Sequence, residues 1–327
     1  MRTRLIDVQP PPDVFAAVMA TGIVSISAAD HRYRWISDTL AGVALLAFVV
    51  MVVLVLRQVG RVGFPYPLRD LDVVVRLFTF VAACAVLGTR FQAHPLAIWP
   101  MAMIAWLAWI FLMPLTVRSM WVQGWTGIRD QAHGVWELVT VATSGLAIVT
   151  AHLALLGRDG ALFAIGLAMW LVAIGLYGVI TWLILWRAAV APTGDLWQPD
   201  SWILMGGLAI ATLAGDRLHL AALTIVTKDW VLTAVRSVTV ATWVAATLWI
   251  PPLIYATLRH LRVRFTGAWW AMVFPLGMYS ATTSAMTIET RWRPFEALST
   301  GFFWIAFTAW LLVALAAIVA FRRAWSR

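Results

Sequence analysis

Ten apolar stretches, separated by short polar joints, make up most of this 327-residue chain. A helix needs about 20 mostly apolar residues to cross a bilayer, and most of the ten approach or exceed that length. The first and seventh are short, so we expect them to be tilted or broken. The stretches cover residues 14–29, 39–56, 73–89, 95–117, 133–156, 161–186, 201–215, 231–258, 266–288 and 295–321. The pattern predicts a polytopic membrane protein with ten transmembrane helices.

The composition excludes a water-soluble fold. Hydrophobic residues make up 62% of the chain and charged residues 12%, whereas a soluble domain carries about 25% charged residues. Strands of a membrane barrel would be roughly 10 residues long with alternating polarity. Runs without alternation, such as residues 161–186, exclude that alternative. The predicted fold class is therefore an all-α integral membrane protein, whose ten helices pair into five helical hairpins.

No polar joint is long enough to form a soluble domain, the longest being residues 57–72 and 187–200. We expect a cytoplasmic lead-in at residues 1–13, a single ten-helix transmembrane domain at 14–321, and a cytoplasmic tail at 322–327. The lead-in contains basic residues but no clear cleavage site, so we do not interpret it as a removed signal peptide.

The distribution of basic residues predicts the orientation. The termini and the joints on their side hold 14 of the 24 basic residues, and the opposite joints hold 8. Because basic residues concentrate on the cytoplasmic side, both termini should be cytoplasmic. Lys228 is the single lysine and asparagine is absent, which is typical of a GC-rich bacterial genome. We therefore expect a bacterial inner membrane, and the absence of a soluble basic domain argues against nucleic acid as a partner.

Three segments together resemble one known family: PPDVFAAVMATGIVSIS at 11–27, SWILMGGLAIATLAG at 201–215 and TGAWWAMVFPLGMYSATT at 266–283. It is the tellurite-resistance and dicarboxylate transporter (TDT) family, which includes bacterial tellurite-resistance proteins, yeast malate and sulfite transporters and the slow-type anion channels of plant guard cells. The resemblance implies five hairpins around a central pore, with odd-numbered helices inside and even-numbered helices outside. It also implies a homotrimer with one pore in each protomer, closed by a phenylalanine on the ninth helix. The matching residue is Phe274.

The sequence around Phe274 is compatible with that role. At helical spacing the ring shares a face with Gly277 and Ala281, so one bulky side chain stands beside small ones. Pro275 frees a carbonyl one turn back and can kink the helix. From the residues alone, an ordinary core or lipid-facing phenylalanine remains an alternative.

Small and hydroxyl-bearing residues concentrate on the odd-numbered stretches. They can line a lumen or allow close packing of helices, and both roles remain open. Hydroxyl dipoles there would bind an anion weakly enough to release it. The predicted pore-lining residues are Thr21, Gly22, Ser25, Gly134, Glu137, Val141, Ser144, Gly206, Gly207, Gly277, Ala281 and Thr282.

Three ionisable residues inside the stretches are functional candidates, because charge is costly in a membrane. Arg76 follows Asp72 by four residues and can pair with it on the helix, and Arg236 can extend toward the interface. Glu137 shares a predicted lumen face with Gly134. It is either an acid near a helix start or a site of proton coupling.

Catalysis has little support in the sequence. The six histidines show no metal-ligand spacing, and no glycine-rich phosphate loop is present, so we predict no metal, no cofactor and no enzyme activity. Asp216 and His219 follow the seventh stretch and are interpreted as a solvated helix cap, with a membrane-embedded enzyme as a distant alternative.

The leading functional hypothesis is a channel or transporter for small inorganic or carboxylate anions. Its alternative is a proton-coupled dicarboxylate carrier or an efflux protein for tellurite or sulfite. In that alternative Glu137 would couple protons, and Arg76 or Arg236 would hold the substrate. Membrane lipid is the other expected partner.

Overall fold

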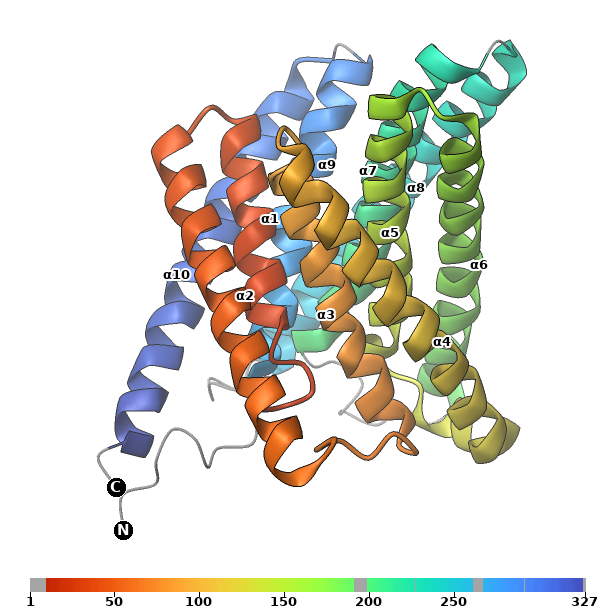
Figure 1. The fold of residues 1–327 in the computed structure, drawn as a ribbon. Coiled ribbons are helices and arrows are strands. Elements are labelled where there is room, and N and C mark those ends of the chain that lie inside the picture. The colour runs from red at the N-terminus through yellow and green to blue at the C-terminus, as the bar shows by residue number, and fades with distance from the viewer. Residues whose placement is uncertain (1–9, 191–198, 227, 261–266, 291, 326–327) are drawn as a thin grey trace.

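A computed structural model describes residues 10–190, 199–226, 228–260, 267–290 and 292–325. Within these ranges there are ten α-helices (Figure 1): α1 (Ala16–Asp30), α2 (Arg34–Val62), α3 (Leu71–Arg90), α4 (Pro95–Gln131), α5 (Leu138–Gly157), α6 (Gly160–Val190), α7 (Ile203–Ile225), α8 (Asp229–His260), α9 (Trp270–Thr290) and α10 (Pro294–Trp325). Three short 3₁₀ turns lead directly into α5, α7 and α9, namely η2 (Gly134–Glu137), η4 (Pro199–Trp202) and η5 (Gly267–Trp269).

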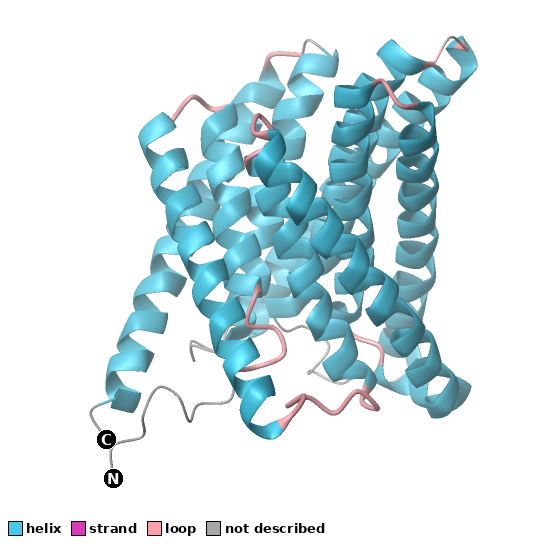
Figure 2. Cartoon of the chain, in the orientation of Figure 1, coloured by secondary structure: helices cyan, strands magenta, loops and turns pink. Residues whose placement is uncertain are grey.

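The described residues form helices and loops, without a strand (Figure 2). This confirms the prediction of an all-α membrane protein. Eight helices in the described ranges, α2 to α8 and α10, are long and apolar enough to cross a membrane. The first helix is apolar but has only 15 residues. That all ten helices cross the membrane stays a prediction.

The odd-numbered helices pack in a closed ring. Around the ring α1 contacts α3, α3 contacts α5, α5 contacts α7, α7 contacts α9, and α9 returns to α1. Each of these helices also packs against the helix that follows it in the chain, from α1 with α2 to α9 with α10. Consecutive helices thus form hairpins that each contribute one inner and one outer member.

Burial separates the inner helices from the outer ones. In the most apolar stretch of α3, α5 and α7, 72, 94 and 67% of the residues are buried. The corresponding share for α2, α4, α6, α8 and α10 is between 17 and 39%. Large apolar side chains on the outer helices remain exposed, including Leu107 and Trp121 of α4. An apolar outer surface is stable in lipid and would be unfavourable in water.

Tryptophan indoles attach the outer helices to the ring. Four of them donate a hydrogen bond to a threonine hydroxyl of an inner helix, which satisfies a buried donor and an acceptor together. The pairs are Trp106 to Thr150 at 3.1 Å, Trp109 to Thr143 at 3.0 Å, Trp243 to Thr283 at 3.1 Å and Trp310 to Thr21 at 2.9 Å. These contacts fix the rotation of α4, α8 and α10 against their partners.

Three helices extend well beyond the predicted stretches. The second stretch was expected at residues 39–56, but α2 covers Arg34–Val62. The fourth stretch was expected to end at residue 117, but α4 continues to Gln131 through a kink at Gly124, where φ is 65°. The seventh was expected to be short or broken, but α7 continues without a break to Ile225. Polar residues that looked like a joint in the sequence therefore belong to α7. The described part of the predicted C-terminal tail, up to Trp325, continues α10.

Candidate functional site

Phe274 lies on the face of α9 that is turned toward the interior of the ring. Its neighbour Pro275 contacts Gly206 of α7, where a Cβ on the glycine would lie 2.8 Å from Pro275 Cγ. Gly277 faces α1, because a Cβ there would lie 3.1 Å from Ile23 Cγ2. With 3.6 residues per turn, Phe274 is about 100° from Pro275 and about 60° from Gly277 on the helix surface. It therefore lies between the α7 and α1 contact faces.

The opposite face of α9 is directed at the outer helices. The hydroxyl of Tyr279 lies 2.8 Å from that of Thr247 on α8. Ser280 donates a hydrogen bond of 2.8 Å to the carbonyl of Ser299 on α10. The outer helices thus occupy the side of α9 away from Phe274. The Phe274 side chain is fully buried inside the bundle.

The other inner helices also turn apolar side chains toward the interior of the ring, from the face between their contacts with neighbouring inner helices. On α3, for example, Val86 faces Gly22 of α1 and Ala85 faces Gly145 of α5, so the residues between these directions point inward. The interior positions are Met19, Ile23, Phe78, Ala82, Val141, Ile148, Ile210, Leu213, Phe274, Met278 and Ala281, and each is at most 3% exposed. Because so little of their surface is accessible to water, these side chains close the axis at this level. Of these interior residues, Val141, Phe274 and Ala281 were named from the sequence, and Phe78 was not, because an isolated aromatic carries no directional signal. That they line a pore stays a prediction.

Several predicted lining glycines lie where two helices approach each other most closely. A Cβ at Gly22 of α1 would be 2.6 Å from Val86 Cγ1 of α3. Gly206 and Gly277 lie at the α7–α9 and α9–α1 contacts described above. Gly134 faces the backbone of Asp200, and Gly207 faces the ring of Tyr177 on α6. At Gly22, Gly206 and Gly277 the absence of a side chain lets neighbouring inner helices approach closely, which is a packing role in this structure.

The predicted hydroxyl dipoles have different surroundings. Thr21 donates to the carbonyl of Ala17 at 2.7 Å and accepts the Trp310 indole, so it faces α10. Ser25 donates to the carbonyl of Ser37 on α2 at 2.7 Å and accepts from Arg90 of α3 at 2.8 Å. Thr282 donates to the carbonyl of Met278 on its own helix at 3.0 Å. The Ser144 hydroxyl is buried without a hydrogen-bond partner among the described residues, which leaves it available to a ligand.

Glu137 is fully buried between α5, α6 and α7. One carboxylate oxygen accepts a hydrogen bond of 2.8 Å from the hydroxyl of Thr181 on α6. The other oxygen has no partner among the described residues and would lie 3.7 Å from a Cβ at Gly207 of α7. Glu137 ends the 3₁₀ turn η2, whose tighter winding shifts its direction from the one expected for a continuous α-helix. It consequently points toward an outer helix, next to α7.

Comparison with known protein families matches residues 9–318 to the SLAC1 family, described as a voltage-dependent anion channel. The match covers all ten helices except the end of the last. The chain belongs to the SLAC1 family. An uncharacterized membrane protein of Mycobacterium tuberculosis, found in two strains, is 28% identical over 151 residues, which cover 43% of this chain and 74% of the relative. The family resemblance of the three sequence segments is therefore confirmed, and this chain is a multi-pass membrane protein of a family of anion channels and transporters.

In this SLAC1 family member, both arginines predicted inside the membrane have carboxylate partners. Arg76 forms the expected helical pair with Asp72 at 2.9 Å and a second pair with Asp13 at 2.9 Å. Arg236 of α8 pairs with Glu289 of α9 at 2.6 Å. These ion pairs attach the lead-in to α3 and α8 to α9, so neither guanidinium is free to act as an isolated charge.

His133 joins the ion-pair cluster around Asp72. Its Nε2 lies 3.0 Å from the carboxylate of Asp72. Burial works to lower the pKa of His133, but hydrogen bonds to Asp72 and to the carbonyl of Gln131 outweigh it and raise the pKa. The cluster lies at the end of the bundle that carries the starts of α3 and α5.

The interpretation of Asp216 and His219 as a solvated helix cap is wrong. Both lie inside α7, with side chains 12 and 14% exposed. Together with Arg236, Thr239, Met286 and Glu289 they line a small cavity between α7, α8 and α9. Burial is possible because the arginine and histidine side chains face the carboxylates. In the described part of the chain, no cluster of three or more histidine, cysteine or acidic residues could hold a metal ion.

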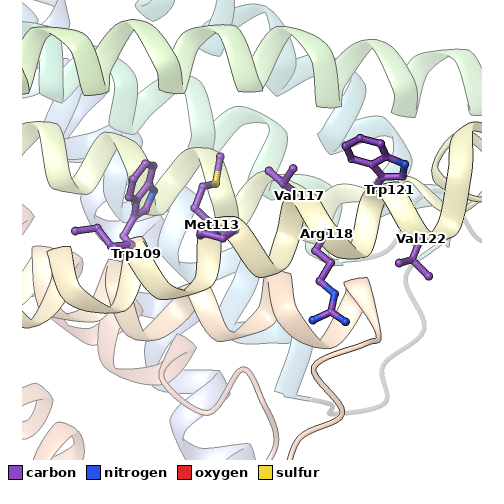
Figure 3. Close-up of a pocket in the computed structure, with 8 residues that line it drawn as sticks. Trp109, Met113, Val117, Arg118, Trp121 and Val122 are labelled. Carbon is purple, nitrogen blue, oxygen red and sulfur yellow. The ribbon is translucent and has the colours of Figure 1, made fainter.

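A groove on α4 is separate from the ring interior. Figure 3 shows the side chains that line it: Trp109, Ile110, Met113, Pro114, Val117, Arg118, Trp121 and Val122. All eight residues belong to this one outer helix, and several of them, including Trp121 and Val122, are strongly exposed. The groove is thus a feature of the outer surface of the bundle, and the candidate pathway is the ring interior around Phe274.

Proposed function

We propose that this SLAC1 family member conducts small anions along the axis of the ring of odd-numbered helices, and that Phe274 closes this path. The observation that carries the proposal is the fully buried position of Phe274, between the contacts of α9 with α7 and α1. The family is one of anion channels, and an aromatic side chain buried among the inner helices can block a path along their axis.

The apolar side chains around Phe274 supply a physical mechanism for closure. An anion at this level would lose its hydration shell and meet Met19, Ile23 and Met278 in place of water. Constrictions of this kind stop ions by excluding water. Opening then requires the ring of Phe274 to rotate away, or α9 to shift against α1 and α7, until water can enter.

The anion would be a small inorganic or carboxylate species, such as chloride, nitrate, sulfite or a four-carbon dicarboxylate. We place the protein in a bacterial inner membrane with both termini cytoplasmic, on the asymmetry of basic residues. We also propose a homotrimer with one pathway in each protomer, as the family resemblance implies. The exposed apolar side chains of the outer helices suit contact with lipid or with neighbouring protomers.

Planar-bilayer recording tests the gate. The wild-type protein should show a low anion conductance, and Phe274→Ala should raise it about tenfold or more by opening a cavity on the axis. Phe303→Ala is the matched control, because Phe303 is equally buried but lies on the outer helix α10. Equal conductance of the wild-type protein and a correctly assembled Phe274→Ala variant would contradict the gate.

A proton-coupled carrier for dicarboxylates, or an efflux protein for tellurite or sulfite, is the second candidate. The observation that favours it is the buried carboxylate of Glu137, of which one oxygen has no partner among the described residues. Its position beside α6 and the carboxylate partners of Arg76 and Arg236 weigh against it. In proteoliposomes, saturable uptake that follows a proton gradient would favour this carrier over the channel.

A further inference from the structure

Arg217 of α7 lies on the interior face of the ring, some distance along the axis from Phe274. It follows Gly206, which faces α9, by 11 positions, and Ile210, which faces Gly145 of α5, by seven positions. At about 100° per residue it projects within about 20° of both, between the α9 and α5 contact faces. Gly206 contacts Pro275, next to the gate. At 1.5 Å per residue, Arg217 is about 16 Å further along the helix.

The electrostatic neighbours of Arg217 come from several inner helices, which agrees with an interior position. Its charge interacts with Asp30 at the end of α1, with His152 near the end of α5, and with Asp216 on α7 itself. Because α1 and α5 are separate members of the ring, an effect on both agrees with a position of Arg217 between them.

This end of the ring is more open than the level of Phe274. Arg217 is 27% exposed and Asp30 is solvent exposed, whereas Phe274 is fully buried. Exposure therefore rises along the axis from the gate to Arg217. The open end is the one where α1, α5 and α7 finish, opposite the end at which the first described residues enter the bundle (Figure 1).

The guanidinium of Arg217 has an unused hydrogen-bond donor. Its Nε is buried and has no hydrogen-bond partner among the described residues, and the nearest carboxylate oxygen of Asp216 lies 3.7 Å away. Arg90 and Arg236 differ in this respect, because each already contacts a carboxylate, at 2.7 Å to Asp38 and at 2.6 Å to Glu289. A buried N–H of a cation without an acceptor is costly, and an anion would satisfy it.

We propose that Arg217 binds the permeating anion at the open end of the ring, before the anion reaches Phe274. This inference rests on the proposed function and names a residue for it. The nearby carboxylates of Asp216 and Asp30 oppose anion binding, so the site is weak. Weak binding suits conduction, since an ion that is held tightly does not pass on.

The test measures anion flux into proteoliposomes as a function of chloride concentration, in the background Phe274→Ala so that the gate does not limit the rate. Arg217→Gln should raise the half-saturating chloride concentration about tenfold, the ratio expected for one charge-assisted hydrogen bond. Arg158→Gln is the control, because Arg158 caps α5 at the same end of the bundle but is exposed. It should leave the half-saturating concentration unchanged.

Asp216→Asn provides a second test that does not depend on the folding of Arg217→Gln. Removing the competing carboxylate should lower the half-saturating chloride concentration several-fold and increase the broadening of the chlorine NMR line by solubilised protein. An unchanged or raised half-saturating concentration in Asp216→Asn, or an unchanged one in folded Arg217→Gln, would overturn the inference. If the parent protein shows no flux at all, the proposed function fails first, so the two failures can be told apart.

Discussion

The ring of Pro275 on α9 occupies the space that any side chain at Gly206 on α7 would need. A Cβ at Gly206 would lie 2.8 Å from Pro275 Cγ and 3.1 Å from its Cβ. The proline is rigid and the glycine has no side chain, so the two helices approach each other closely there. This contact holds α9 against α7 one residue away from Phe274.

Gly206→Ala should therefore destabilise the protein. The added methyl group must displace a ring that cannot rotate, and overpacking of this kind typically costs about 1–3 kcal/mol. Gly175→Ala on α6 is the control, since a Cβ there meets no atom within 4 Å and should leave the free energy of unfolding unchanged or raise it by up to about 1 kcal/mol. Unfolding in detergent measures both, and a Gly206→Ala variant as stable as the wild type would contradict the packing described here.

Gly22 and Val86 should be energetically coupled. A Cβ at Gly22 would lie 2.6 Å from Val86 Cγ1, so Gly22→Ala alone forces α1 away from α3. Adding Val86→Ala removes the obstructing methyl groups and should recover about 0.5–3 kcal/mol of that loss in a double-mutant cycle. Strictly additive losses in the free energy of unfolding would show that the two residues do not meet.

Replacing Glu137 by Gln should distinguish the channel from the carrier. Glutamine keeps an acceptor for the Thr181 hydroxyl and removes a charge that is buried without full compensation. For a channel we expect anion flux within about twofold of the wild type and no dependence on a proton gradient. Proton-driven flux in the wild type that disappears in Glu137→Gln would instead support the carrier.

The raised pKa of His133 predicts a pH-dependent stability. Because the folded protein binds the proton more tightly than the unfolded chain, the stabilisation is complete below the ordinary value of 6.5. It is lost as the pH rises through the higher pKa of the folded state. The unfolding temperature in detergent should fall over this range in the wild type, and His133→Gln should flatten the fall. His94→Gln, at an exposed histidine, is the control and should keep the wild-type slope.

The sequence by itself determined the fold class and the pairing of consecutive helices. Hydrophobic length is a local property, so ten apolar stretches predicted ten helices, and short joints predicted that consecutive helices pair. The motif around Phe274 identified the family, which the comparison over residues 9–318 bears out. Within α9, the spacing of Phe274, Gly277 and Ala281 was enough to place them near one face.

Only the tertiary structure decided how each helix is rotated and which side chains have partners. Glycine suits a lumen and a close contact equally well, and only the neighbouring helix showed that Gly22 and Gly206 lie at contacts. Glu137 turned toward α6 because a 3₁₀ turn precedes α5. Asp216 and His219 resembled a solvated helix cap because charge in a sequence usually means solvent. They are largely buried in α7, where they line a cavity with Arg236 of α8 and Glu289 of α9. These partners are distant in the chain, and charge pairing depends on distance in space.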